Sequence, residues 1–184
     1  MNIKRAILAC AQAASGRASR TVIQKLMYLS TLKGLTKASF EPHYYGPYST
    51  EVAATLQDLA STGLVDESIQ TWPSIGDPWE IRRYSYAVPT EVAKALEKGL
   101  LDEERNQAES MARLVEACEK RGALNPKSLS VATKILFILH ETGRPLTESQ
   151  IAANAESLGW KLSKEVIEKS VVGLLSDLSL VERT

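Results

Sequence analysis

Apolar residues recur every three or four positions along much of the N-terminal third, which is the spacing of one face of a helix. The pattern predicts three helices in succession, over residues 3–14, 20–33 and 50–61. Local signals support these bounds. Ser19 and Ser49 stand where N-caps belong, and Gly34 and Gly63 stand where the second and third helices would end.

After residue 63 the pattern changes from helical to extended. Residues 64–69 and 81–88 contain alternating, β-branched and aromatic side chains, which are typical of strands. Residues 72–79, with two tryptophans and two prolines, predict a long turn between them. Three helices followed by a β-hairpin are the element order of a winged helix, so we expect residues 1–88 to form a winged-helix-like domain.

A linking helical segment, residues 89–126, follows the predicted hairpin. It is highly charged, but its second half carries one narrow apolar stripe made of Ala108, Met111, Leu114, Val115 and Cys118. Such a stripe packs within its own chain or forms the seam of a homodimer, and the sequence leaves both open. Gly122 and Pro126 interrupt the helical pattern and mark a domain boundary.

The last third of the chain resembles a second copy of the first helices. Residues 25–29 match residues 134–138 in residue type, and residues 49–52 and 163–166 both have the pattern of a capped helix start. We therefore expect residues 127–184 to form a second helix-turn-helix, winged-helix-like domain, with its wing cut short by the chain end. The expected fold class is mainly α with a small β-hairpin.

Charge is distributed unevenly, although the net charge is zero. Residues 1–40 hold seven Lys or Arg and no carboxylate, whereas residues 41–80 hold seven carboxylates and no Lys or Arg. Unopposed positive charges predict an electropositive patch. The candidate nucleic-acid contacts are Arg17, Arg20, Lys25 and Lys33 in this block, Arg82 and Arg83 on the wing, and Lys161 and Lys164 in the second unit.

The stretch between the two charge blocks, residues 40–49, contains three of the six tyrosines. Its Gly-Pro pair favours a turn, because glycine adopts positive φ and proline fixes its own φ. One interpretation is a structural turn that seats the third helix on the second, and the other is an aromatic surface for a partner. The residues concerned are Tyr44, Tyr45, Gly46, Pro47, Tyr48 and Ser49.

No pattern in the sequence indicates an enzyme, a metal site or a cofactor. His43 and His140 are far apart, and neither has a neighbour at ligand spacing. Cys10 and Cys118 are also far apart, and we expect reduced core thiols in a cytoplasmic protein. The chain shows no signal peptide and no apolar stretch of membrane-spanning length.

Three segments carry a resemblance to a known family. They are Gln-Lys-Leu-Met-Tyr-Leu at 24–29, His-Tyr-Tyr-Gly-Pro-Tyr-Ser at 43–49 and Gly-Leu-Val at 63–65. In these segments the chain resembles the YwgA-like prokaryotic proteins, which are predicted transcriptional regulators. It is more distantly similar to the Panacea antitoxin domain, which shares a Lys-Leu-x-Tyr-Leu helix and a Tyr-Gly-Pro turn. The resemblance implies a winged-helix-like fold and a regulatory role, and the similarity to Panacea implies neutralisation of a toxin protein.

The leading hypothesis from the sequence is a non-enzymatic winged-helix transcriptional regulator that binds duplex DNA. The predicted third helix would ordinarily enter the major groove, but it carries Glu51 and Asp58 and no Lys or Arg. An acidic helix is poorly suited to phosphates, so another face would have to bind the DNA. The alternative is a protein-interaction module, such as an antitoxin or an adaptor in a prokaryotic defence or toxin–antitoxin system.

Overall fold

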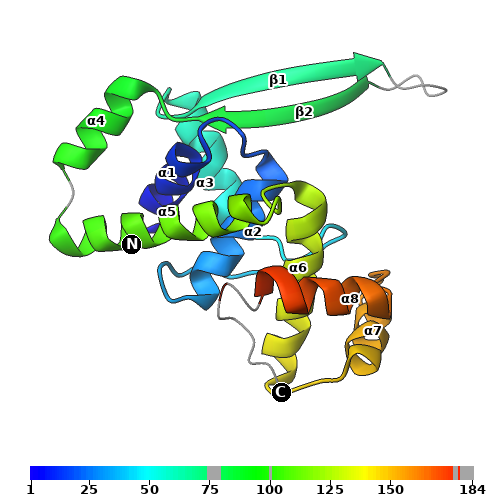
Figure 1. Cartoon of the computed structure of the whole chain (residues 1–184). Helices are drawn as coiled ribbons and strands as arrows, with labels where there is room; N and C mark the ends of the chain where they lie inside the picture. The colour runs from blue at the N-terminus through cyan, green and yellow to red at the C-terminus, as the bar shows by residue number, and fades with distance from the viewer. Residues whose placement is uncertain (74–79, 100, 176–177, 179–184) are drawn as a thin grey trace.

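The computed structural model describes residues 1–73, 80–99, 101–175 and 178. Within these residues the protein is mainly helical with one two-stranded antiparallel hairpin, as the sequence predicts (Figure 1). The elements in chain order are α1 (Ile3–Ala14), α2 (Arg20–Leu32), α3 (Thr50–Ser61), β1 (Asp66–Pro73), β2 (Glu80–Ala87), α4 (Thr90–Lys98), α5 (Asp102–Lys120), α6 (Pro126–Thr142), α7 (Glu148–Ser157), α8 (Lys164–Ser170) and the π-helical turn η1 (Val171–Leu175).

The starts of the early helices are fixed by side-chain caps close to them in sequence. Ser19 Oγ accepts a hydrogen bond from Val22 N, and Ser49 Oγ accepts one from Val52 N, each at 3.3 Å. Each bond satisfies one backbone N–H that the first turn of a helix leaves unpaired. The predicted starts of α2 and α3 are therefore confirmed, and α1 and α3 have the predicted bounds.

The hairpin is longer than the sequence suggests. β1 and β2 pair in antiparallel register from Asp66 opposite Ala87 to Pro73 opposite Glu80, so β1 includes two residues that we expected in the turn. Cross-strand hydrogen bonding, which has no local sequence signal, extends β1, whereas β2 keeps its predicted length and is shifted by one residue. At the base of the hairpin the buried Tyr86 donates its N–H to Ala18 O at 3.1 Å. This bond anchors the hairpin to the segment just before α2 (Figure 1).

The apolar stripe of the linking segment packs within the chain. Met111, Leu114, Val115 and Cys118 of α5 are buried, and α5 packs against α1 and contacts α2 (Figure 1). Burial against α1 gives this face a partner inside the chain, so it does not form an exposed dimer seam. By contrast, none of the described side chains of α4 is buried.

The C-terminal helices α6, α7 and α8 are joined to the N-terminal helices through α2. α6 packs against α2, and α7 and α8 pack against α6 and against each other (Figure 1). The buried apolar side chains form one cluster that runs from Ile3 to Leu178. The predicted second wing, at residues 179–182, falls outside the described residues. In the described part of the chain, no helix combines the length and apolar character needed to cross a membrane.

Candidate nucleic-acid interface

The tyrosine-rich stretch folds as a small closed loop between α2 and α3. Glu41 and Tyr48 exchange two backbone hydrogen bonds, each 2.9 Å long. Inside this bridge, Gly46 N donates to His43 O at 2.8 Å and closes a four-residue turn. Gly46 has a φ of +96°, a conformation that glycine adopts without a Cβ clash. The two residues between His43 and Gly46 therefore occupy the tip of the turn.

Those two residues are Tyr44 and Tyr45, and their side chains project into solvent. Tyr44 is 73% exposed and Tyr45 is 58% exposed. Their rings meet edge to face, with centroids 4.8 Å apart and an angle of 88° between the planes. Large aromatic side chains bury a substantial area when they find a partner, so two adjacent exposed rings are a candidate contact surface.

Helix α2 holds the base of the loop through two buried polar side chains. Gln24 makes two hydrogen bonds with the backbone of Ser49, and Lys25 Nζ donates to Pro47 O at 2.7 Å. Lys25 is only 2% exposed. It therefore does not reach the surface, which corrects its prediction as a nucleic-acid contact. The Gly-Pro turn and the cap of α3 are instead seated directly on α2.

Helix α6 and the loop after α7 hold the other side of the same turn. A Cβ added at Gly46 would lie 3.1 Å from Lys134 Cγ and 3.4 Å from Ser130 O, so the turn packs closely on α6. Trp160 Nε1 donates to His43 O at 2.8 Å. The tip of the turn is thus fixed by elements from both helical units.

Between this turn, α6 and the loop that joins α7 to α8 lies a cleft with a volume of about 710 Å³. Three lysines line it, and none of the described residues that line it is acidic. The side chains that give the cleft its chemistry are Tyr44, Tyr45, Lys127, Ser130, Lys134 and Lys161. We call it the lysine–tyrosine cleft.

Positive charge in the wall of this cleft is partly removed from water. Lys134 is half-buried, its Nζ lies 5.3 Å from the centroid of the Trp160 ring, and burial lowers its pKa. The pKa of Lys25 is lowered to about 7, mainly by burial and to a smaller extent by the positive charge of Lys134. A desolvated cationic group interacts more strongly with an anion than a solvated one does. The cleft is therefore suited to a negatively charged ligand.

Ser130 adds an unused polar group to the same wall. It is 9% exposed, and its Oγ makes no hydrogen bond with any described residue. A buried hydroxyl without a partner costs free energy, so such a group calls for an explanation. The Oγ atom itself is buried, so it is not presented to a ligand in the cleft.

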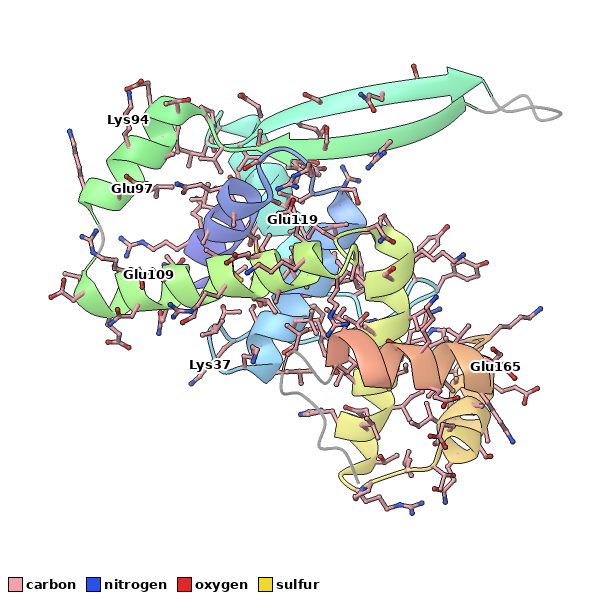
Figure 2. The ribbon with its side chains drawn as sticks, in the orientation of Figure 1. Lys37, Lys94, Glu97, Glu109, Glu119 and Glu165 are labelled. Atoms are coloured by element: carbon pink, nitrogen blue, oxygen red, sulfur yellow. The ribbon has the colours of Figure 1, made fainter. Side chains whose placement is uncertain are left out.

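The basic N-terminal block is largely compensated inside the chain. Four of its positive side chains form ion pairs with carboxylates of α3, β1 and α5, which lie in other parts of the sequence. The ion pairs are Lys4–Asp58 at 3.0 Å, Arg20–Glu67 at 3.4 Å, Arg5–Glu104 and Arg17–Glu119. Lys33 Nζ donates to Leu178 O at 2.8 Å. Lys37 projects outward on the left of the view, below α5 (Figure 2).

Arg20 connects α2 to the hairpin. Its Nε donates to Tyr86 OH at 3.1 Å, and its guanidinium carbon lies 4.4 Å from the centroid of the Tyr84 ring. Tyr86 OH in turn donates to Glu67 Oε2 at 2.6 Å. The planar guanidinium fits this stacked and hydrogen-bonded position, which gives Arg20 a structural role.

The remaining predicted contacts are divided between the hairpin and the start of α8 with the loop before it. Arg83 is exposed on β2, and the side chain of Arg82 falls outside the described residues. Lys164 is exposed at the start of α8. Among the predicted contacts whose side chains the structure describes, Lys161 is the one that lines the lysine–tyrosine cleft. Sequence reasoning missed Lys127 and Lys134.

A signal for Lys134 was present in the sequence. It occupies the position that corresponds to Lys25 in the internal repeat, where residues 134–138 match residues 25–29. For Lys127 the sequence carries no comparable signal, because only the packing of α6 beside the tyrosine turn brings it to the cleft. Compared with known proteins, the chain matches no family model and no curated protein.

Proposed function

We propose that the protein is a non-enzymatic regulator that binds nucleic acid in the lysine–tyrosine cleft. The observation that carries this proposal is the meeting of Lys127, Lys134 and Lys161 with Tyr44 and Tyr45 in one cleft that has no acidic residue among its described lining. Lysines supply the attraction to phosphates that dominates the affinity of most nucleic-acid-binding proteins. Exposed aromatic rings supply surfaces on which bases stack.

The arrangement on α6 supports a row of phosphate contacts. Lys127, Ser130 and Lys134 follow one another at spacings of three and four residues, which places them on one face of the helix. They span about 10 Å along the axis at 1.5 Å per residue. Lys161, in the loop that joins α7 to α8, lines the same cleft. A backbone of phosphates running along α6 would meet positive charge from both elements.

A protein-interaction role is the second candidate, and an apolar groove favours it. The groove has a volume of about 380 Å³ and lies between α1, α4 and α5, with Leu8 and Leu96 in its lining. Leu101, the residue that precedes α5, is 72% exposed. Apolar grooves of this kind accept an amphipathic helix from a partner, as an antitoxin or adaptor role requires. Leu96→Glu would weaken binding to such a partner and leave nucleic-acid binding unchanged.

The proposal is tested by fluorescence anisotropy with labelled oligonucleotides at several salt concentrations. We expect binding that weakens as salt rises from about 50 to 200 mM. Lys127→Ala plus Lys161→Ala should lower the affinity and reduce the slope of log K against log salt by about 1 for each lysine. The matched control is Lys37→Ala plus Lys94→Ala, which removes the same charge at two outward-facing positions (Figure 2).

Lys37 follows the C-terminal end of α2, whereas Thr21, near its N-terminal end, lines the cleft. The control positions should therefore leave both the affinity and the slope unchanged. Absence of binding to every oligonucleotide at low salt, or an equal loss in the control variant, would overturn the proposal.

A further inference from the structure

We infer that the nucleic acid bound in the lysine–tyrosine cleft is single-stranded, with an unpaired base stacked on Tyr44 or Tyr45 and neighbouring phosphates on Lys127, Lys134 and Lys161. This inference rests on the proposed function and names its ligand. Single-stranded DNA and single-stranded RNA share the required chemistry.

The first argument is the way the turn presents the two rings. Both tyrosines are at the tip of a turn whose backbone is fixed by the hydrogen bonds from Lys25 to Pro47 O and from Trp160 to His43 O. The edge-to-face contact sets one ring at 88° to the other, so one forms a platform and the other a side wall. A rigidly mounted tyrosine loses little conformational entropy when a base stacks on it.

The second argument is that a duplex does not offer what these rings can bind. In a double helix each base is stacked on its neighbours, and only base edges are accessible from the grooves. The faces of bases become available when the strand is unpaired, and stacking on aromatic side chains is then the common mode of recognition. Exposed tyrosines beside a row of lysines therefore fit an unpaired strand.

The third argument concerns the helices that would otherwise read a duplex. α3 carries Glu51 and Asp58 and no Lys or Arg, and Asp58 is paired with Lys4 at 3.0 Å. α8 has seven residues, and its basic side chains are interspersed with Glu165 and Glu168. Neither helix presents a continuous basic face to the major groove of a duplex.

The size and floor of the cleft agree with a small portion of one strand. A volume of about 710 Å³ lies within the range of about 300–1,000 Å³ for sites that enclose a small ligand, whereas a duplex is too wide to enter such a site. The half-buried Lys134 lies in the wall of the cleft, and its positive charge contributes to the low pKa of the neighbouring Lys25. A phosphate oxygen beside Lys134 would offset the repulsion between the two lysines.

The inference is tested with four labelled ligands of equal length: oligodeoxythymidine, oligouridine, a DNA duplex, and an abasic strand that keeps the phosphates but has no bases. We expect both single strands to bind more tightly than the duplex, with the tighter of the two identifying DNA or RNA as the ligand. The abasic strand should bind more weakly than oligodeoxythymidine.

The variants separate stacking from charge. Tyr44→Ala plus Tyr45→Ala should weaken binding of the single strands by about 5- to 150-fold, the effect of losing one stacked base. Tyr44→Phe plus Tyr45→Phe keeps both rings and should retain most of the affinity. Neither pair should change binding of the abasic strand. Thermal unfolding serves as a check on folding, which both pairs should preserve because the two side chains are exposed.

The two proposals fail in different ways. Absence of binding to all four ligands overturns the proposed function. Binding that depends on Lys127 and Lys161 but favours the duplex, or that is unchanged by the tyrosine-to-alanine variant, overturns only the single-strand inference.

Discussion

Gln24 holds the backbone of Ser49 with both ends of its side-chain amide. Its Nε2 donates to Ser49 O at 2.9 Å, and its Oε1 accepts from Ser49 N at 2.9 Å. Ser49 is the N-cap of α3, and both residues are buried. The side chain of Gln24 thus acts as a peptide group would in a strand pair, and it fixes the start of α3 against α2.

Replacing Gln24 by alanine should therefore destabilise the protein. Gln24→Ala leaves the buried N–H of Ser49 unpaired and removes one of two hydrogen bonds to Ser49 O, which also accepts from Ala53 N. We expect this to lower the free energy of unfolding by about 1–3 kcal/mol. Urea denaturation followed by circular dichroism measures the change. Gln57→Ala, at an exposed position of α3, is the matched control and should have little effect. An equal loss in the two variants would contradict the role given to Gln24.

A second prediction concerns the fit between the tyrosine turn and α6. Gly46→Ala should lower the free energy of unfolding by about 1–3 kcal/mol, because alanine is strained at the positive φ of this position. The added Cβ would also lie only 3.1 Å from Lys134 Cγ, which should increase the loss. Gly34→Ala isolates the first effect, because Gly34 has a φ of +69° and nothing within 4 Å of its would-be Cβ. Denaturation of both variants should show the larger loss at Gly46. A larger loss at Gly34 would argue against close packing of the turn on α6.

The low pKa of Lys25 predicts a stability that depends on pH. Burial and the charge of Lys134 lower the pKa of Lys25 to about 7 in the folded protein, below that of a lysine in the unfolded chain. Between these two values the unfolded chain holds a proton that the folded chain has lost, so stability rises with pH. The gain should reach at most about 1.4 kcal/mol per pH unit.

Lys25→Met removes this titration and provides the reference. The difference in unfolding free energy between the wild type and Lys25→Met should be constant below pH 7. Above pH 7 the wild type should become more stable relative to Lys25→Met as the pH rises. Lys134→Met removes one cause of the lowered pKa, so the same change should then begin at a higher pH. A difference that is flat across the whole range would show that Lys25 titrates normally in the fold.

The two cysteines should be unreactive in the native protein. Both are buried free thiols. Burial raises the pKa of Cys118 to about 12. The pKa of Cys10 is also raised, mainly by burial and to a smaller extent by the nearby Cys118. The thiolate is the reactive form, so both protection from solvent and the raised pKa slow the reaction. A chromogenic disulfide reagent should label neither thiol before denaturation and both after it. Rapid labelling of the native protein would show that the contact between α1 and α5 opens.

Arg20→Ala should loosen the hairpin without affecting ligand binding. It removes the hydrogen bond to Tyr86 OH and the stacking on Tyr84, which together connect α2 to β2. Hydrogen exchange should become faster for the backbone amides of β1 and β2, while the salt dependence of nucleic-acid binding should stay unchanged. Arg83→Ala, at an exposed position of the same hairpin, is the control and should leave exchange unaltered. A reduced salt slope in Arg20→Ala would instead place Arg20 at the binding surface.

Features that depend on neighbouring residues could be predicted from the sequence. The bounds of α1 and α3 and the cap at Ser19 follow from side chains within three or four residues of each helix end. The strands were less well defined, because β1 ends where pairing with β2 ends and not where the local pattern changes. Helix α5 illustrates both cases, since its apolar stripe was visible but its partner, α1, was not.

The candidate site could be predicted only in part. The tyrosine turn was identified because glycine, proline and an N-cap mark it locally. The electrostatics of the basic block were not predictable, because Lys4, Arg5, Arg17 and Arg20 pair with carboxylates that are distant in the chain. Arg17 and Glu119, for example, are separated by 102 positions. The cleft itself exists only because α6 packs beside the turn, and no local pattern encodes that contact.

One oxygen atom, the carbonyl oxygen of His43, accepts hydrogen bonds both from Gly46 N and from Trp160 Nε1. The indole lies 117 positions further along the chain. A change in the loop that joins α7 to α8 would therefore be transmitted to the tip that carries Tyr44 and Tyr45. Docking of the C-terminal helices and the position of the turn that carries these two rings are thus coupled through a single acceptor atom.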